Sequence, residues 1–481
     1  MAYSTSKKLL IGLGIICAVV CGQIIILSQS SFQTKAIVMR ANFVVIMETV
    51  IFLFSFLIWR TTAYIFDASY LHESFASNSN GNGDLTSAGL FGRGQLRKKS
   101  KNSDIDLSTF DRRETASSST LSISFLWKLI LLFYLGVCHV SYFTNLFLIS
   151  KDPHWFSMLT YACLGSFIQL NTGLLMFKSL SYILKLSSRH IHINCQLTRK
   201  KVAVFSLVYM LCASSLGLYK ASQPPVVSNV EISIHNLPKN LEGLSIVQLS
   251  DIHLGPTVGF VKLEKIVEIV NGIKPDIVVL TGDLVDSSVQ RLGGAATPLG
   301  SVRSKYGNFF ATGNHEYYTG DVDNWFQVIS SLGFTVLHNS HVVIPSQVSE
   351  TEGQICLAGT DDVQADKIGY GDHKFDLGSA VGSCSQERPV ILLAHQPAAA
   401  KIALDSKYRI DLVLSGHTHG GQIFPMIIGA YLLNPFYAGL YEYGGKGRYV
   451  YVSQGTQYWG IPMRIATSME VTRIVLHASI P

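Results

Sequence analysis

The sequence predicts an α/β protein in two parts, a helical membrane domain over residues 1–221 and a soluble α/β domain over residues 222–481. Three features predict this division. Apolar residues make up 48% of the chain and charged residues only 15%, which is unusual for a soluble protein. The apolar excess is concentrated before residue 222. After that point, short β-rich runs alternate with helix-like segments, which is the pattern of layered α/β folds.

Five apolar stretches are long enough to cross a bilayer, because roughly twenty helical residues suffice. They are Leu9–Leu27, Ala41–Trp59, Phe125–Leu148, Phe156–Leu180 and Val202–Leu218. The first follows Lys7 and Lys8, as a cleaved signal peptide would. Its length and the further stretches favour a retained anchor. We therefore expect a multi-pass membrane protein.

The distribution of positive charge predicts the orientation. The segment before the last stretch contains Lys185, Arg189, Arg199, Lys200 and Lys201 and no acidic residue, which indicates a cytoplasmic loop. With five spans, residues 222–481 then lie outside the cytoplasm, in a lumen or outside the cell. Lys35 and Arg40, in the first outer loop, oppose this orientation. One span more or fewer would reverse it.

The segment from about residue 71 to 120 is rich in Ser, Asn and Gly, and we expect it to be disordered. Its basic cluster, Arg97-Lys98-Lys99, is interpreted as solvated charge, with contact to anionic lipid as the alternative. The net charge is +6, and no basic stripe is interleaved with aromatic residues, so nucleic acid is not an expected partner.

Cysteine usage leaves one question open. Of eight cysteines, only Cys356 and Cys384 lie after residue 222. They could pair if this half is outside the cytoplasm, although their spacing alone does not decide it.

The soluble half contains eight predicted strands and three predicted helices. The apolar and alternating runs predict strands at 230–234, 244–249, 277–280, 308–311, 389–393, 410–414, 449–452 and 470–475. Helical periodicity predicts helices at 260–270, 321–332 and 398–404.

Five of these strands lead directly into polar side chains. The motifs are Asp251-Ile252-His253, Gly282-Asp283, Gly313-Asn314-His315-Glu316, His395 and Ser415-Gly416-His417-Thr418-His419-Gly420-Gly421. On extended backbone, His417 and His419 would face the same way. Taken alone, they could equally be hydrogen-bonding residues of a polar turn. Five such endings together predict a metal centre on the edge of a sheet.

These motifs, in this order, resemble the calcineurin-like metallophosphoesterase family over about the last half of the chain. The resemblance implies two mixed β-sheets packed face to face and flanked by helices. It also implies a hydrolase acting on phosphoesters, in which a metal-bridging hydroxide attacks phosphorus.

The resemblance further implies two divalent metal ions. Asp283 would bridge them, Asp251, His253 and His419 would complete one site, and Asn314, His395 and His417 would complete the other. Oxygen and nitrogen ligands together suit manganese, iron or zinc, without identifying one of them.

The resemblance assigns His315 as a general acid that faces the substrate and Asp286 as the residue that orients it. A helix N-cap is the alternative role for Asp286. The other histidines of this half are expected to be surface or hydrogen-bonded residues: His235, His338, His341, His373 and His477.

One departure from the family concerns phosphate binding. Protein phosphatases of this superfamily have an arginine just after the second aspartate, where this chain has Ser287 and Ser288. Phosphoprotein substrates are therefore disfavoured. Arg464 is a candidate substitute clamp, because a guanidinium matches phosphate oxygens, and a salt-bridged structural role is the alternative.

The predicted function is a membrane-anchored, dinuclear-metal phosphoester hydrolase acting on diesters or monoesters. An aqueous nucleotide or sugar phosphodiester is one possible substrate class, and a phospholipid or lipid-linked phosphate is another. The alternative function is a non-catalytic metal-binding receptor or scaffold on a membrane anchor. A transporter is disfavoured, because ionisable residues are scarce within the apolar stretches.

Overall fold

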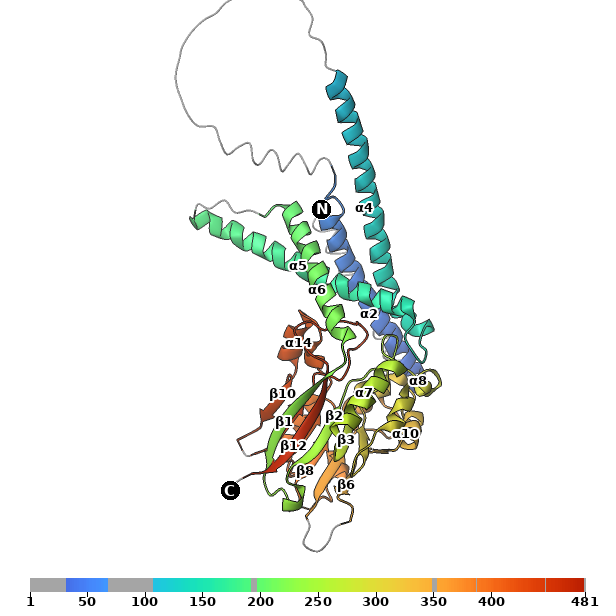
Figure 1. Ribbon diagram of the computed structural model, residues 1–481, viewed down its shortest axis with the longest axis vertical. Coiled ribbons are helices and arrows are strands. Elements are labelled where there is room, and N and C mark those ends of the chain that lie inside the picture. Colours follow the sequence, from blue (N-terminus) through green and yellow to red (C-terminus); the bar gives the residue numbers. More distant parts are fainter. Residues whose placement is uncertain are drawn as a thin grey trace, which may run out of the picture. The chain divides into compact units, whose positions relative to one another are not determined.

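The computed structural model describes residues 32–67, 107–191, 197–347, 353–385, 387–445 and 447–479 (Figure 1). Four long helices precede the β-strands: α2 (Phe32–Thr62), α4 (Leu107–Phe147), α5 (Trp155–Ile191) and α6 (Arg199–Ser222). The chain divides into two compact units. One comprises Met1–Thr49, Val140–Gly165 and Ala213–Pro481, and the other comprises Val50–His139 and Ser166–Cys212. The predicted domain boundary after residue 221 stays a prediction.

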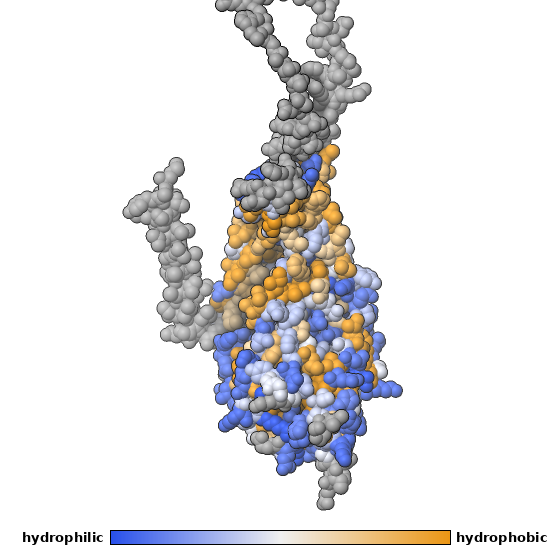
Figure 2. All heavy atoms as spheres, turned by 90° about the vertical axis from the view of Figure 1, so that its left-hand side faces the viewer, coloured by the Kyte–Doolittle hydropathy of each residue, from blue (hydrophilic) through white to orange (hydrophobic). Residues whose placement is uncertain are grey.

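Among the described residues, three helices are long and apolar enough to cross a membrane: Val38–Thr62, Ile123–Phe147 and Arg199–Ser222. They correspond to the second, third and fifth predicted stretches, and Figure 2 shows apolar side chains gathered over the helices. The first predicted stretch lies outside the described residues. The fourth lies in α5, which is helical but less apolar, because Gln169, Asn171 and Thr172 interrupt the run. The described residues therefore contain three candidate spans rather than four.

The predicted disordered segment is wrong at its C-terminal end. Helix α4 begins at Leu107, so residues 107–120 are helical and continue directly into the third apolar stretch. Extending an existing helix costs far less than starting a new one, which explains how a polar run can continue an apolar helix. The rest of the predicted segment, from about residue 71 to 106, lies outside the described residues.

The first β-sheet has the strand order β1-β12-β2-β3-β4-β5. Its strands are β1 (Val226–Ile234), β12 (Glu470–Ala478), β2 (Leu244–Leu249), β3 (Ile277–Thr281), β4 (Asn308–Ala311) and β5 (Phe334–Val336). Strands β2 to β5 are parallel, and β12 runs antiparallel to β2. The sheet is therefore mixed.

The second sheet has the order β10-β11-β9-β8-β7-β6. Its strands are β10 (Gly439–Glu442), β11 (Tyr449–Val452), β9 (Leu412–Ser415), β8 (Val390–Leu393), β7 (Ile355–Gly359) and β6 (Ser340–Ile344). The four inner strands are parallel, while β6 and β10 pair antiparallel at the two edges. This sheet is mixed as well.

The two sheets share one apolar core, which includes Ile246 and Val279 from the first sheet and Ile391 and Leu414 from the second. Helices α7 (Phe260–Ile273), α8 (Val289–Ala296) and α10 (Val322–Ser331) contribute to a core with the first sheet, and α12 (Leu377–Val381) and α13 (Pro397–Leu404) to one with the second. The remaining short elements are α9 (Asn314–Thr319), α11 (Gln364–Ile368), α14 (Met426–Leu433), η1 (Lys239–Leu241), η2 (Thr297–Ser301) and η3 (His419–Gly421). The predicted fold of two mixed sheets flanked by helices is confirmed.

Cys356 and Cys384 form a disulfide that joins β7 to the segment after α12. The structure therefore answers the question that the spacing of these cysteines left open.

Candidate metal centre

The seven proposed ligands all follow the C-terminal ends of parallel strands. Asp251 and His253 follow β2, Asp283 follows β3 and Asn314 follows β4 in the first sheet, while His395 follows β8 and His417 and His419 follow β9 in the second. Parallel strands present these ends on one edge of a sheet, and face-to-face packing brings the two edges together. This is why residues up to 168 positions apart in the sequence meet at one place.

Asp251, His253 and His419 form a first group of potential ligands, whose candidate atoms lie within 4.8 Å of one another. Nε2 of His253 lies 2.9 Å from Nε2 of His419. Oδ1 of Asp251 lies 3.4 Å from Nε2 of His419. All three residues are buried.

Asp283, His395 and His417 form a second group, again with candidate atoms within 4.8 Å of one another. Nε2 of His395 lies 3.2 Å from Oδ2 of Asp283. Asn314 joins this group through its Oδ1, which lies 2.8 Å from Nδ1 of His417.

Asp283 lies between the two groups. Its Oδ2 is 3.2 Å from Nε2 of His395 in the second group and 3.7 Å from Nε2 of His253 in the first. One carboxylate oxygen therefore faces an imidazole nitrogen from each group, which is the position that a bridging ligand requires.

The donor set fits metal ions. The buried Nε2 of His395 faces Oδ2 of Asp283 at 3.2 Å, while its Nδ1 lies 2.8 Å from the carbonyl oxygen of Thr281. His253 places its Nδ1 2.8 Å from Asp286. Such contacts fix the proton on Nδ1 and leave Nε2 free to bind a metal. Burial lowers the pKa of His417 to about 3, so this imidazole is neutral, the form that binds metals.

The backbone at the site is strained. Asp251, His253, Asp283, His417 and His419 all have positive φ angles, between 51° and 71°. Residues other than glycine rarely adopt this conformation, and it accumulates at functional sites where the surrounding structure enforces it.

This backbone corrects the expectation that His417 and His419 share one direction on an extended strand. His417 belongs with Asp283 and His395, and His419 belongs with Asp251 and His253. Gly416 precedes them, and a Cβ atom at this position would overlap the side chains of Ser250 and Asp251. Only a glycine lets the turn approach the first group so closely.

His315 lies beside the centre and remains 15% exposed. Its Nδ1 is 2.8 Å from Oδ1 of Asp286, and its backbone N–H donates to Oδ1 of Asp283. Burial opposes protonation of the imidazole, but Asp283 and Asp286 outweigh burial and raise the pKa of His315 to about 9. The ring is therefore held protonated near neutral pH.

Asp286 has a wider role than the sequence indicated. Its Oδ1 contacts Nδ1 of His253 as well as Nδ1 of His315, each at 2.8 Å. Burial opposes ionisation, but the two histidines outweigh it and lower the pKa of Asp286 to about 2. The N-cap of α8 is Ser288, so the alternative role of Asp286 as a helix cap is wrong.

Sequence reasoning missed Glu316. This fully buried carboxylate accepts the backbone N–H groups of Asp283, Leu284 and Gly313 at 2.7 to 3.0 Å. It therefore holds the loop of the proposed bridging residue against the loop that contains Asn314. No local signal in the sequence indicates this contact, because Asp283 and Leu284 lie 33 and 32 residues away.

Arg464 does not face an open surface. It is 1% exposed, and its guanidinium donates to the carbonyl oxygens of His419 and Gln457 and lies 3.4 Å from Nδ1 of His419. These contacts correct the expectation of a phosphate clamp. The arginine instead supports the His419 loop, through hydrogen bonds rather than the salt bridge that the structural alternative assumed.

Four of the other five histidines of this half, His338, His341, His373 and His477, form side-chain hydrogen bonds away from the centre. His477 lies 2.7 Å from Glu242, and His341 lies 2.9 Å from the carbonyl oxygen of Ala380. His338 and His373 both lie near Asp361, at 2.6 and 3.7 Å.

Comparison with known proteins identifies the family. A model described as calcineurin-like phosphoesterase matches residues 244–421, which contain all seven proposed ligands. A transmembrane protein with metallophosphoesterase domain from Danio rerio is 47% identical over 352 residues, 73% of this chain and 80% of that protein. The protein of that name from Bos taurus is 45% identical over 362 residues, 74% and 81% of the two chains. An uncharacterized metallophosphoesterase from Aquifex aeolicus is 33% identical over 272 residues, 56% and 98% of the two chains. The predicted resemblance is confirmed, and the chain belongs to the calcineurin-like phosphoesterase family.

Proposed function

We propose that this protein is a membrane-anchored hydrolase of phosphoesters with two divalent metal ions in its active site. The position of Asp283 carries the proposal. Its Oδ2 faces Nε2 of His395 and Nε2 of His253, which belong to two separate groups of ligands. A single metal site would not need one carboxylate oxygen between two such groups.

The proposed ligands are the seven residues named from the sequence: Asp251, His253, Asp283, Asn314, His395, His417 and His419. Manganese, iron and zinc are the candidate ions. When bound, two such cations neutralise the phosphate and lower the pKa of an attacking water. Asp286 and the carbonyl oxygen of Thr281 hold His253 and His395 in the orientation that binding requires.

His315 is the proposed general acid. An alkoxide leaving group needs a proton in the transition state, and a positioned acid contributes on the order of a hundredfold to ten-thousandfold to the rate. The imidazole is protonated, partly exposed and oriented by Asp286, which are the properties that this role requires. Asp286 keeps its charge over the same pH range and so stabilises the protonated ring.

The membrane part of the proposal follows from the candidate spans and the charge of the connecting segments. Residues 1–221 would anchor the protein with several spans, and residues 222–481 would form the catalytic domain outside the cytoplasm. The disulfide between Cys356 and Cys384 supports this side, because disulfides persist in oxidising compartments.

The direct test uses the purified full-length protein with Mn²⁺, Fe²⁺ or Zn²⁺ and with nitrophenyl phosphate mono- and diesters. Hydrolysis that requires metal and is lost in Asp283→Asn is the expected result. Asp276→Asn is the matched control, since this aspartate belongs to the turn before β3 and contacts the backbone of Ser245. Two bound metals without any hydrolysis would favour the non-catalytic receptor or scaffold instead.

A further inference from the structure

Helix α14 is apolar on every side and yet exposed. Its sequence, Met426 to Leu433, contains no charged residue, and none of its eight residues is buried. Five of its large apolar side chains are 51% to 84% exposed: Met426, Ile428, Tyr431, Leu432 and Leu433. A helix that is apolar all round is normally covered, by protein or by lipid. No described part of the chain buries this one.

The helix is attached directly to the loop of a proposed metal ligand. Helix η3 begins at His419, and its last residue, Gly421, approaches Ile427 so closely that a Cβ atom would overlap the Ile427 backbone. Tyr437, which follows α14, donates from its hydroxyl group to the carbonyl oxygen of Gly420. Whatever covers α14 therefore lies next to the active site.

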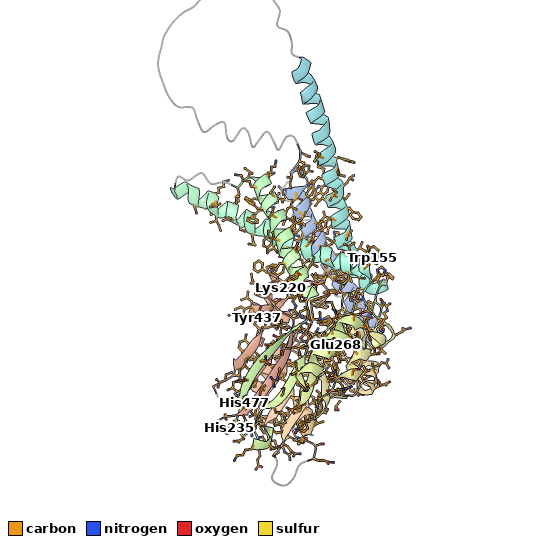
Figure 3. The ribbon with its side chains drawn as sticks, in the orientation of Figure 1. Trp155, Lys220, His235, Glu268, Tyr437 and His477 are labelled. Carbon is orange, nitrogen blue, oxygen red and sulfur yellow. A yellow bond between two sulfur atoms is a disulfide. The ribbon has the colours of Figure 1, made fainter. Side chains whose placement is uncertain are left out.

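The same loop packs against the end of a candidate membrane span. The carbonyl oxygen of Gln422 accepts the N–H of Ile465, and the N–H of the adjacent Arg464 donates to the carbonyl oxygen of Gly217 in α6. The α6 span ends within a few residues, with Lys220 in its last turn. In Figure 3, Lys220 and Tyr437 lie at the same end of the catalytic domain, and His235 and His477 lie at the opposite end. The α14 end of the domain is thus the end nearest to the α6 candidate span.

Trp459 is an exposed aromatic residue beside the proposed general acid. Its side chain is 40% exposed, and its ring centroid lies 5.2 Å from that of His315 and 6.1 Å from that of His253. The side chain of Gln422 bonds both the N–H and the carbonyl oxygen of Trp459, which ties this segment to the loop that precedes α14. An apolar group on a substrate would meet the Trp459 ring beside His315.

We infer that α14 lies in the interfacial layer of the bilayer and that the substrate is a phosphoester carried by a lipid. The inference rests on the proposed function and names its substrate class. The bilayer is the occupant that fits, because the apolar helix has no charge to pair with a polar partner and follows a loop bonded to the end of a membrane span. A lipid in that layer would reach the metal centre without leaving the membrane.

The position of α14 can be tested by fluorescence. The full-length protein carrying Tyr431→Trp is reconstituted in phosphatidylcholine vesicles with or without bromine on the acyl chains. After subtraction of the wild-type signal, brominated lipid should quench the added tryptophan. Ile402→Trp is the control, since Ile402 is a 53% exposed apolar residue on a different helix, α13. No quenching of the tryptophan in Tyr431→Trp by brominated lipid overturns the inference. Quenching that depends on the number of protein molecules per vesicle, and not on bromine, also overturns it and would indicate that a second copy of the chain covers α14.

The substrate class can be tested with two esters that share one scissile bond, ethyl nitrophenyl phosphate in solution and hexadecyl nitrophenyl phosphate in phosphatidylcholine vesicles. The wild type should prefer the hexadecyl ester by roughly tenfold or more in kcat/KM. Leu432→Glu and Leu433→Glu should remove this preference and leave ethyl ester hydrolysis within about twofold, because exposed side chains contribute little to folding. Ile402→Glu should change neither rate.

Equal rates of the wild type on both esters, or equal losses on both esters in the α14 variants, would overturn the lipid substrate. Hydrolysis of neither ester with any of the metals would instead contradict the proposed function, while the fluorescence result would still report where α14 lies. The two failures are therefore distinguishable.

Discussion

Oδ1 of Asp286 lies 2.8 Å from Nδ1 of His315, so a single carboxylate oxygen fixes the ring that is proposed to donate the proton. The same oxygen contacts His253, a proposed metal ligand. The acid and the metal centre are therefore positioned by one side chain. Disturbing this side chain should affect both.

The proton role of His315 predicts a dependence on the leaving group. His315→Ala should slow hydrolysis of alkyl esters by on the order of a hundredfold or more and slow nitrophenyl esters far less, because nitrophenolate leaves without a proton. Asp286→Asn should give a milder version. Kinetics on both esters, with metal content measured in parallel, check this. Equal slowing of both esters would mean that His315 binds phosphate instead.

The bridging position of Asp283 predicts a difference in metal content. Asp283→Asn removes a charge that both groups share, whereas His395→Ala damages one group only. Elemental analysis of the two purified variants should therefore find less metal in Asp283→Asn. A full complement of two metals in that variant would contradict the bridge.

Glu316 should matter for stability as well as for activity. In the wild type, backbone N–H groups donate to both oxygens of the Glu316 carboxylate. Glu316→Gln replaces one of these oxygens by an NH₂ group, which cannot accept, and each buried N–H left without an acceptor costs about 1–3 kcal/mol. The thermal midpoint of the purified protein should fall, and metal should bind less tightly. Glu242→Gln is the control, because Glu242 is an exposed glutamate that bonds His477 on the far side of the domain. Equal shifts in the two variants would argue against the positioning role.

The pair of His338 and Asp361 predicts a pH dependence of stability. The hydrogen bond that Nδ1 of His338 donates to the Asp361 carboxylate raises the pKa of His338 above its usual value. A raised pKa in the folded state stabilises the fold fully below the unfolded pKa of about 6.5 and loses this effect as pH rises through the folded pKa. His338→Gln should therefore lower the thermal midpoint more near pH 6 than near pH 9. The same difference at both pH values would show that charge is not involved.

The proposed orientation predicts where glycans can be added. No Asn-x-Ser/Thr sequon follows residue 222, so an acceptor sequon appended after Pro481 reports cleanly. It should be glycosylated in cells, whereas a sequon inserted between residues 71 and 106 should not. The reverse pattern would place the catalytic domain in the cytoplasm.

The sequence was sufficient for the elements whose signal is local. Each predicted strand of the catalytic half is present, and each proposed ligand follows a strand, because an apolar run and the polar residue at its end stand together in the sequence. The family resemblance supplied what local pattern could not, the face-to-face packing of the sheets. Four strands were not predicted: β5, β6 and β10, which are edge strands, and β7, which lies beside the edge strand β6.

Other features depend on contacts across the chain and so were missed. Glu316 acts on the backbone of Asp283, 33 residues away, and nothing near it in the sequence indicates that contact. The positive φ angles of the ligands arise from the packed loops around them. Helix α14 has an apolar sequence that is typical of a buried helix, and only the structure reveals that it is exposed.

The two sheets contribute separate halves of the proposed ligand set. Asp251, His253, Asp283 and Asn314 extend from the first sheet, and His395, His417 and His419 extend from the second. Metal ions held by both sets would therefore cross-link the two sheets, in addition to any role in chemistry. Separating the two sheets would require the metal–ligand bonds to break first. Removal of the metal ions by a chelator should therefore lower the mechanical force at which the protein unfolds, while its apolar core is unchanged.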